Sequence, residues 1–240
     1  MLGLFKISKS VSESGFLRGA VDSHSHILYG VDDGVKTEEE SLQILSYMEE
    51  AGVETLWLTP HIMEDVPNTS EGLRIRFAQL KSAYKGGVNL SLAAEYMLDN
   101  LFMERLRSRD ILCHCGNNVL VEASASAPPV DFWNMLTEIF DYGYIPILAH
   151  PERYLYLRPQ DYERLGKMGV HLQLNMFSLT GIYGPQVGMR ARYLLGRDVY
   201  SLWGSDCHRY SVLQKQYSLK ALKKDELRRL EALKFGLKGR

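Results

Sequence analysis

The chain has 240 residues, enough for one large domain, and its 45% hydrophobic and 24% charged residues are ordinary for a globular protein. A formal net charge of -1 without a basic stripe excludes nucleic acid as the expected main partner. Three cysteines make no disulfide framework, and the first residues lack the apolar core of a signal peptide. No run approaches the roughly 20 apolar residues that span a bilayer. We therefore expect a cytoplasmic protein that is not embedded in a membrane.

Apolar, strand-like runs alternate with helical patterns along the chain. Strands are expected over residues 20–28, 53–61, 88–96, 118–124, 144–150, 170–175 and 199–208. Helices are expected over 37–52, 70–85, 99–108, 130–142, 159–169, 185–195 and about 218–234. Strict alternation predicts parallel strands joined by helical crossovers. We therefore expect one α/β barrel domain over residues 1–240, with a short N-terminal extension over about 1–18.

The helical signal is clearest over residues 37–52. Its apolar residues recur at three-residue steps, at Leu42, Leu45, Met48 and Ala51. Thr37 is a plausible N-cap with Glu40 at the capping-box position, and Gly52 is expected to end the helix.

Histidines or carboxylates follow five of the seven predicted strands, always at the carboxyl end. They are His24, His26, Asp32 and Asp33 after the first strand, His61 after the second, Glu95 after the third, His150 after the fifth, and Asp206 and His208 after the seventh. In a parallel barrel these ends meet at one rim. The two-residue steps from His24 to His26 and from Asp206 to His208 put each pair on one face, with Cys207 turned away. The pattern predicts a metal centre.

The donor set indicates which metals fit. Five histidines with two or three carboxylates and no thiolate favour Mn, Fe, Zn or Mg. So many donors exceed the needs of one ion, so two or three ions are expected, with Glu95 as the bridging carboxylate. Such clustered ions suit hydrolysis of a phosphoryl group, because they activate water and clamp phosphoryl oxygens.

Other histidines and turns have simpler interpretations. A lone buried histidine is more often a hydrogen-bonded core residue than a ligand, and His171, which begins a strand, is interpreted as structural. His114 lies in "CHCG" without a second Cys/His pair, so a structural or surface role is favoured over a zinc site. The "DDG" at 32–34 could form only a turn, but after His-x-His we favour one of its two aspartates as a ligand.

An arginine accompanies the fifth strand in "HPERY", residues 150–154. The guanidinium of Arg153 cannot bind a cation, but it suits phosphate oxygens. The alternative is an ion pair with Glu152 or Glu163. Tyr154 and Tyr156 are candidates for an aromatic slot or for packing at the rim.

Five motifs are recognisable together: "DSHSHILYGVDDG", "TPH", "AAEY", "AHPERY" and "GSDCH". In order and spacing they resemble the polymerase and histidinol phosphatase (PHP) superfamily, most closely its bacterial tyrosine-phosphatase branch of capsule and exopolysaccharide operons. The resemblance runs from about residue 21 to residue 208. It implies a distorted (β/α)7 TIM-like barrel with a trinuclear, often Mn2+-dependent centre. It also implies a phosphotyrosine substrate in the tail of a bacterial tyrosine kinase that controls polysaccharide synthesis.

The resemblance also implies roles for single residues. The implied ligands are His24, His26, Asp33, His61, Glu95, His150, Asp206 and His208, and Asp33 is thus chosen over Asp32. Arg153 is the implied phosphate-binding residue, and we predict that Arg153, Asp33 and His208 are catalytic. A second arginine expected beyond the last histidine is not evident, since Arg209 is adjacent to it. The oligomerisation motif of some members is not matched by "EEESLQ", which leaves the assembly state open.

Two other functions stay open. The first is a phosphatase of a small phosphomonoester such as histidinol phosphate. The second is a non-catalytic module in which metals hold the barrel together and the surface binds a kinase.

Overall fold

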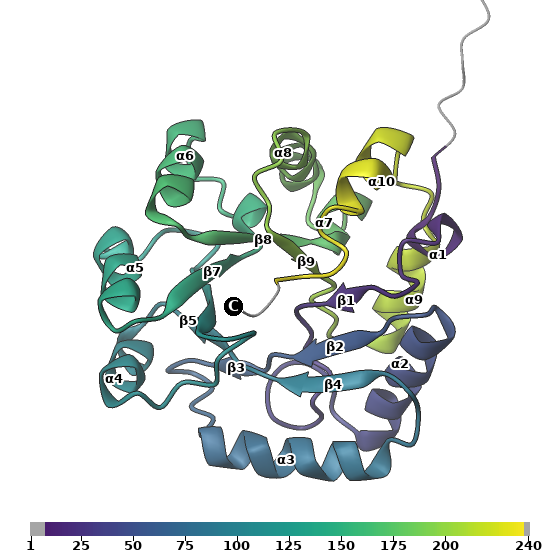
Figure 1. Cartoon of the computed structure of the whole chain (residues 1–240), viewed down its shortest axis with the longest axis horizontal. Coiled ribbons are helices and arrows are strands. Elements are labelled where there is room, and N and C mark those ends of the chain that lie inside the picture. The colour runs from purple at the N-terminus through teal and green to yellow at the C-terminus, as the bar shows by residue number, and fades with distance from the viewer. Residues whose placement is uncertain (1–7, 238–240) are drawn as a thin grey trace, which may run out of the picture.

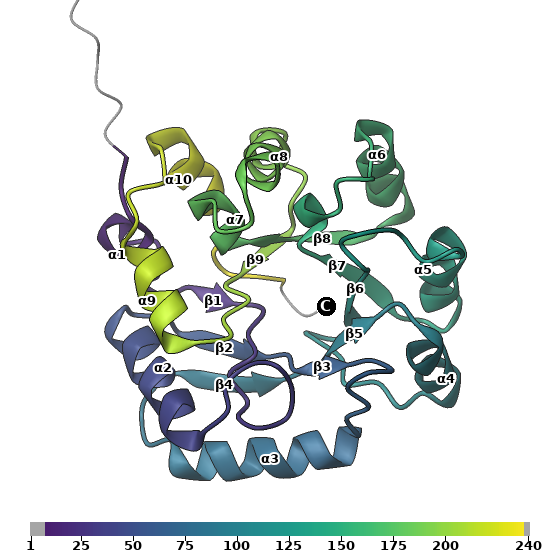
Figure 2. The same cartoon turned by 180° about the vertical axis from the view of Figure 1, so that it is seen from behind.

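The computed structural model describes residues 8–237. Strands surround the centre of the molecule and helices lie around them (Figures 1 and 2). The strands are β1 (Val21–Asp22), β2 (Thr55–Leu58), β3 (His61–Ile62), β4 (Asn89–Leu92), β5 (Glu95–Met97), β6 (Asn118–Glu122), β7 (Ile145–Ala149), β8 (His171–Asn175) and β9 (Leu202–Gly204). The helices are α1 (Val11–Ser14), α2 (Glu38–Glu50), α3 (Ser70–Ala83), α4 (Asn100–Ser108), α5 (Phe132–Asp141), the 3-10 turn η1 (Pro151–Arg153), α6 (Pro159–Met168), α7 (Met176–Thr180), α8 (Pro185–Gly196), α9 (Tyr210–Ser218) and α10 (Lys224–Leu230).

All strand pairs in the described residues are parallel, in the orders β1-β2-β4 and β3-β5-β6-β7-β8-β9. A parallel bridge between Ser25 and Cys207 joins the end of the chain's last strand to its first. The backbone N–H of Asp206 also donates to the carbonyl of His24 at 2.9 Å. The sheet therefore closes, which confirms the predicted parallel α/β barrel.

Two predicted strands are each broken in the middle. The run 53–61 becomes β2 and β3, and the run 88–96 becomes β4 and β5. Leu58 pairs with Leu92 and His61 pairs with Glu95, so the register is unchanged across the break. Pro60, which has no N–H to donate, lies at the break. The distortion places His61 and Glu95 side by side at the rim.

The helix boundaries follow local sequence signals, with one correction. The hydroxyl of Thr37 accepts a hydrogen bond from the N–H of Glu40 at 3.3 Å, as the N-cap prediction requires. The helix predicted over about 218–234 is instead the end of α9 and the separate α10. Leu222, between the two helices, exchanges two backbone hydrogen bonds with Lys9. The N–H and C=O of Leu222 are therefore not available for the hydrogen bonds of a continuous helix.

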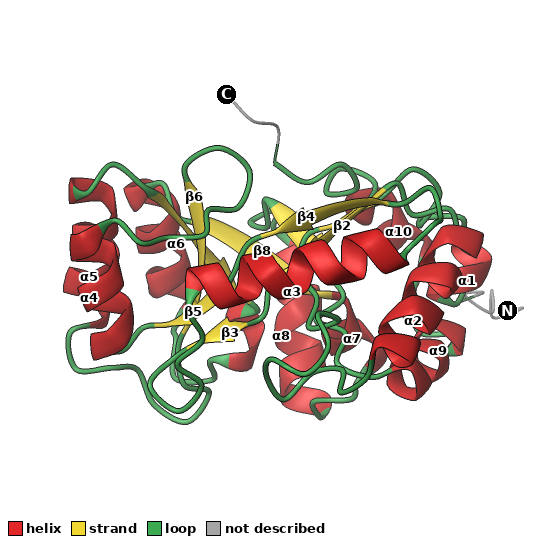
Figure 3. Ribbon diagram, turned by 90° about the horizontal axis from the view of Figure 1, so that it is seen from below, coloured by secondary structure: helices red, strands yellow, loops and turns green. Residues whose placement is uncertain are grey.

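Most of the core lies between the strands and the outer helices, which Figure 3 shows along the sides of the barrel. Val11, Phe16 and Leu17 of the predicted N-terminal extension are buried in this core, while residues 1–7 lie outside the described residues. A smaller apolar cluster lies within the barrel wall and packs against Leu237 near the end of the chain. No helix in residues 8–237 is long and apolar enough to cross a membrane.

His114 is a core residue, and among residues 8–237 no group suited to a metal ion includes it or its neighbouring cysteines. Its ring stacks on Trp57 with 3.9 Å between centroids. Nε2 lies 3.1 Å from the carbonyl oxygen of Ser23, and Nδ1 accepts a hydrogen bond from the N–H of Cys115. The structure therefore gives this histidine the structural role that was favoured.

We predict that His114 limits stability in acid. Burial lowers the pKa of His114 to about 3, whereas a histidine in the unfolded chain has a pKa of about 6.5. The neutral, buried ring therefore contributes fully to the free energy of unfolding above pH 6.5, and this contribution is lost as the pH falls towards 3. Between pH 7 and pH 5 the wild type should lose about 2 kcal/mol more unfolding free energy than His114→Gln. Urea unfolding with a chelator at both pH values measures this difference. Equal losses in the two proteins would contradict the prediction.

Candidate metal centre

The rim at the carboxyl ends of the strands brings all the predicted ligands together. His24 and His26 follow β1, His61 begins β3, Glu95 begins β5, His150 follows β7, and Asp206 and His208 follow β9. Each belongs to at least one of four overlapping groups of donor atoms that lie within 4.8 Å of one another. Asp33, from the loop after β1, is the remaining predicted member.

Glu95 lies at the middle of the cluster. Its Oε2 is 3.2 Å from Nε2 of His24 and 3.2 Å from Nε2 of His26. The same oxygen is 3.3 Å from Nδ1 of His61, and Oε1 is 3.0 Å from Nε2 of His150. One carboxylate thus faces four imidazoles, the position expected of a bridging ligand.

Asp206 joins the cluster from the segment after β9, which pairs with the segment that carries His24 and His26. Its Oδ1 lies 3.5 Å from Nε2 of His24 and 3.4 Å from Nε2 of His26. Its Oδ2 accepts a hydrogen bond from the amide of Asn175 at 2.7 Å. One oxygen is therefore held by the protein while the other faces the histidines.

The two aspartates of "DDG" have different surroundings. Asp33 is 71% exposed at its side chain, and its Oδ1 lies 3.6 Å from Nε2 of His61 and 3.4 Å from Nε2 of His208. Asp32 is buried instead, with Oδ2 2.9 Å from Nδ1 of His26. Asp32 also accepts backbone hydrogen bonds from Gly34 and His61. The geometry places Asp33 among the donors and gives Asp32 the task of orienting the His26 ring.

Glu122 joins the cluster, although the sequence analysis did not select it. Its Oε1 lies 3.1 Å from Nδ1 of His61 and its Oε2 lies 3.8 Å from Nε2 of His150. It forms a donor group with His61 and Glu95. The signal in the sequence is a single acidic residue at the carboxyl end of the apolar run "NVLVE", at the same end of its strand as the other ligands.

The charges in the cluster favour a bound cation. Burial lowers the pKa of His24, but Glu95 and Asp206 outweigh it and raise the pKa to about 9. Burial likewise lowers the pKa of His61, but Glu122 and Glu95 raise it to about 10. These histidines hold protons that a metal ion would displace.

Buried atoms that lack a hydrogen bond support the same conclusion. Oε2 of Glu95 and Nδ1 of His61 are buried, and although oppositely charged groups lie 3.1 to 3.3 Å away, neither atom makes a hydrogen bond of good geometry in the described residues. The Nε2 atoms of His24 and His26 face each other at only 2.9 Å. Such a set of imidazole nitrogens and carboxylate oxygens fits divalent ions such as Mn, Fe or Zn.

A further layer of residues orients the ligands. Nδ1 of His24 lies 3.2 Å from Oε1 of Gln173, and the hydroxyl of Tyr154 lies 3.3 Å from Nδ1 of His150. Contacts of this kind select the tautomer and rotation of a metal-binding imidazole. Because Tyr154 is fully buried, it supports His150 and does not form an aromatic slot.

The backbone is strained at two of these positions. His150 has φ 34° and Asp206 has φ 54°, values that non-glycine residues rarely adopt. Strain of this kind persists where the surrounding structure enforces it, often at functional sites.

At Gly204 a Cβ atom would lie 2.4 Å from Cβ of His24, so only glycine allows this close approach.

Arg153 lies beside the cluster and belongs to none of its donor groups. Its Nη1 is 3.4 Å from Oδ2 of Asp206, and its guanidinium lies 4.7 Å from the ring centroid of Tyr183. Glu152, one alternative ion-pair partner, is buried and instead accepts hydrogen bonds from Asn175 and Tyr200. The arginine side chain is therefore placed next to the candidate ligands.

Arg209 has a different position. Its Nη1 donates to the carbonyl oxygens of Gly34 and His208. The residue thereby connects the loop that carries Asp33 to the end of the last strand.

Comparisons with known proteins identify a matching family and similar proteins. A family model described as "Capsular polysaccharide synthesis, CpsB/CapC" matches residues 20–223. The tyrosine-protein phosphatase CpsB of Streptococcus pneumoniae is 29% identical over 228 residues, 85% of this chain and 93% of that protein. The tyrosine-protein phosphatase YwqE of Bacillus subtilis (strain 168) is 27% identical over 195 residues, 78% of this chain and 77% of that protein.

Solved structures share the fold. One chain comes from the crystal structures of YwqE from Bacillus subtilis and CpsB from Streptococcus pneumoniae, described as metal-dependent tyrosine phosphatases. It matches with a TM-score of 0.75 and 24% identity over 90% of this chain and 88% of that chain. A lactonase from Listeria monocytogenes matches with a TM-score of 0.57 and 13% identity over 92% of this chain and 93% of that chain.

Proposed function

This chain belongs to the CpsB/CapC family of capsular polysaccharide synthesis, and we propose that it is a metal-dependent tyrosine-protein phosphatase. The observation that carries the proposal is the convergence of histidines and carboxylates at one rim of the barrel, with the Arg153 guanidinium beside them. Relatives of similar length that carry the name tyrosine-protein phosphatase support the substrate class.

The cluster would hold two or three divalent ions, to which we assign Mn2+. The ligands we assign are His24, His26, Asp33, His61, Glu95, His150, Asp206 and His208, together with Glu122. All the donors are imidazole nitrogens or carboxylate oxygens, the types that Mn, Fe and Zn accept. When bound, such ions lower the pKa of water and offset negative charge on phosphoryl oxygens.

The residues around the ligands orient the substrate. The planar guanidinium of Arg153 can donate to two oxygens of a phosphoryl group, and Tyr183 and Asp206 hold it beside the cluster. Asp33 and His208 are the most exposed of the ligands we assign, so we place them at the edge that meets the substrate. The leaving phenol has a pKa of about 10, so its departure makes a small demand on a proton donor.

The test is a substrate panel assayed with and without Mn2+. We expect hydrolysis of p-nitrophenyl phosphate and of a phosphotyrosine peptide, loss of both activities with chelator, and recovery when Mn2+ is added. Metal analysis of the same sample should give two to three ions per chain. A loaded protein that hydrolyses neither substrate would overturn the proposal and favour a non-catalytic, kinase-binding module.

The same panel separates the rival enzyme function. Histidinol phosphate is a small monoester without a peptide. A kcat/KM for histidinol phosphate well above that for the phosphotyrosine peptide would assign the chain to the small-molecule phosphatases of the wider superfamily.

The proposal also covers the cellular setting. We infer that the substrate is the phosphorylated tail of a bacterial tyrosine kinase and that the protein is cytoplasmic. Three free cysteines are consistent with a reducing compartment. We further infer that the chain acts as one domain, since one apolar cluster extends from Val11 to Leu233.

Glu122 provides a test of the ligand assignment. Glu122→Gln keeps the size of the side chain and removes its charge beside His61 and His150. We expect at least one ion fewer per chain and a kcat/KM about 10- to 100-fold lower. Mass spectrometric metal analysis beside steady-state kinetics measures both quantities. Full occupancy with normal kinetics would remove Glu122 from the ligand set.

Cys207 should take no part in the chemistry. The side chain is fully buried in the core, and burial raises the pKa of its thiol. We expect Cys207→Ala to keep activity within a few-fold, and iodoacetamide to inhibit the wild type poorly while chelators inhibit it strongly. Rapid inactivation by alkylation that phosphate prevents would instead indicate a thiol nucleophile.

A further inference from the structure

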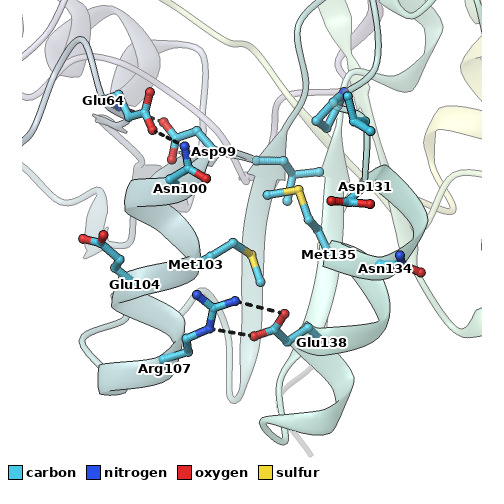
Figure 4. A pocket seen from close by; sticks show the side chains of 13 residues that line it. Glu64, Asp99, Asn100, Met103, Glu104, Arg107, Asp131, Asn134, Met135 and Glu138 are labelled. Carbon is cyan, nitrogen blue, oxygen red and sulfur yellow. Dashed lines mark hydrogen bonds and ion pairs between the residues drawn. The ribbon is translucent and has the colours of Figure 1, made fainter.

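A groove of about 650 Å³ runs between α4 and α5 (Figure 4). Met103 from α4 and Met135 from α5 point into it from opposite sides, and Leu98 also lines it. Its edges carry the carboxylates of Glu64, Asp99, Glu104, Asp131 and Glu138 and the guanidinium of Arg107. The groove thus combines two methionine side chains in its interior with an acidic edge.

The groove begins where the metal centre ends. The N–H of Leu98 donates to the carbonyl oxygen of Glu122 at 2.9 Å. Glu64 follows His61 by three residues, so their Cα atoms lie within about 10 Å. The loop after β6, which leaves the rim at Glu122, contributes Pro129 and Val130 to the groove. A peptide bound at the metal centre can therefore continue into the groove.

The negative charge of the groove is largely uncompensated. Arg107 is paired with Glu138, with Nε at 3.0 Å from Oε1 and Nη2 at 3.4 Å from Oε2. Within the part of the chain that the structure describes, Glu104 and Asp131 are exposed and form no hydrogen bond or ion pair through their side chains. The lining therefore contains four more carboxylates than cationic groups.

We propose that this groove binds a lysine or arginine side chain of the phosphotyrosine substrate, at a position within about four residues of the phosphotyrosine. The methionines suit the aliphatic stem of such a side chain, and Glu104 and Asp131 suit its charged head. An extended peptide advances about 3.3 Å per residue, so a side chain three or four residues away lies about 10–13 Å from the phosphotyrosine. The proposal rests on the proposed tyrosine phosphatase function and adds a sequence preference to it.

The experiment compares two phosphotyrosine peptides of equal length. One peptide carries lysine, and the other glutamate, at the third and fourth positions before and after the phosphotyrosine. At low ionic strength the wild type should have a kcat/KM about three- to tenfold higher for the lysine peptide, the size expected for one or two exposed charge pairs. Glu104→Gln combined with Asp131→Asn should bring this ratio close to one, as should high salt. Glu71→Gln combined with Glu163→Gln removes two exposed carboxylates elsewhere and should keep the wild-type ratio.

The outcomes separate this proposal from the proposed function. If the wild type hydrolyses p-nitrophenyl phosphate, and if its kcat/KM is the same for the lysine peptide and the glutamate peptide, the phosphatase function stands and the groove proposal fails. The groove proposal would also fail if both double variants kept the same preference for the lysine peptide, because the groove carboxylates would then not be the source of that preference. A changed molecular mass of the groove variant in light scattering, with an unchanged peptide ratio, would assign the groove to a second copy of the chain instead.

Discussion

Asp206→Asn and His24→Ala should each remove bound metal and lower kcat/KM on the order of 10³-fold or more. The reason is that the ions would supply several kcal/mol of charge stabilisation to the transition state, and this would be lost with them. The two residues follow the last and the first strands of the chain, which pair where the barrel closes, and their side chains meet at 3.5 Å. His24 also contacts Glu95, the central carboxylate. His24 belongs to two of the overlapping donor groups and Asp206 to one, so loss of either residue disturbs the cluster.

The measurement combines metal analysis by mass spectrometry with steady-state kinetics on a phosphotyrosine peptide. His171→Ala is a matched control, because this histidine begins β8 and belongs to none of the donor groups in the described residues. It should keep full metal content. Normal occupancy and turnover in either ligand variant would refute the assignment of that residue.

Arg153→Ala should keep the metal content and the fold while losing about 10²- to 10³-fold in kcat/KM, or about 3–4 kcal/mol. The guanidinium contacts Asp206 and the Tyr183 ring but is not a ligand, so its removal leaves the donor set intact. Its two parallel N–H donors match phosphoryl oxygens, and they matter most when charge shifts during transfer. Arg153→Lys should rescue only part of the loss, since an ammonium cannot reproduce the planar pair of donors.

Arg197→Ala is the control for this change. Its guanidinium also lies over a tyrosine ring, that of Tyr193 at 5.4 Å, but at the end of α8. It should have wild-type kinetics. Unchanged kinetics in Arg153→Ala would make that residue a surface ion-pair partner, whereas loss of metal would mean that it supports the ligands.

Much of the architecture could be predicted from the sequence, because it depends on local patterns. Alternating apolar runs and helical periods indicate parallel strands with helical crossovers, and such strands place their carboxyl ends at one rim. That rule alone was enough to group His24, His61 and His150, which are far apart in the chain. The hydroxyl of Thr37 caps its helix as expected, since capping involves only neighbouring residues.

Other features depend on contacts between distant segments, and local patterns contain no signal for them. The break between α9 and α10 follows from the backbone pairing of Leu222 with Lys9, more than 200 residues earlier. The break in the run 88–96, which contains no proline, follows from its pairing with the run 53–61, where Pro60 lies. The groove between α4 and α5 depends on how these two consecutive helices pack, which the pattern of neither helix alone shows.

The metal centre shows the same division. The sequence by itself determined which residue types gather at the rim, because a strand's direction and its two-residue period are local properties. It could not choose between Asp32 and Asp33 without the family resemblance, since adjacent residues in a loop have no fixed period. It also left Glu122 unnoticed, because one acidic residue at the end of an apolar run is common in strands. The tertiary structure alone shows which carboxylate oxygen lies within reach of which imidazole nitrogen, because that distance depends on how separate strands and loops pack. This geometry supports Asp33 and Glu122 as the ligands that we propose.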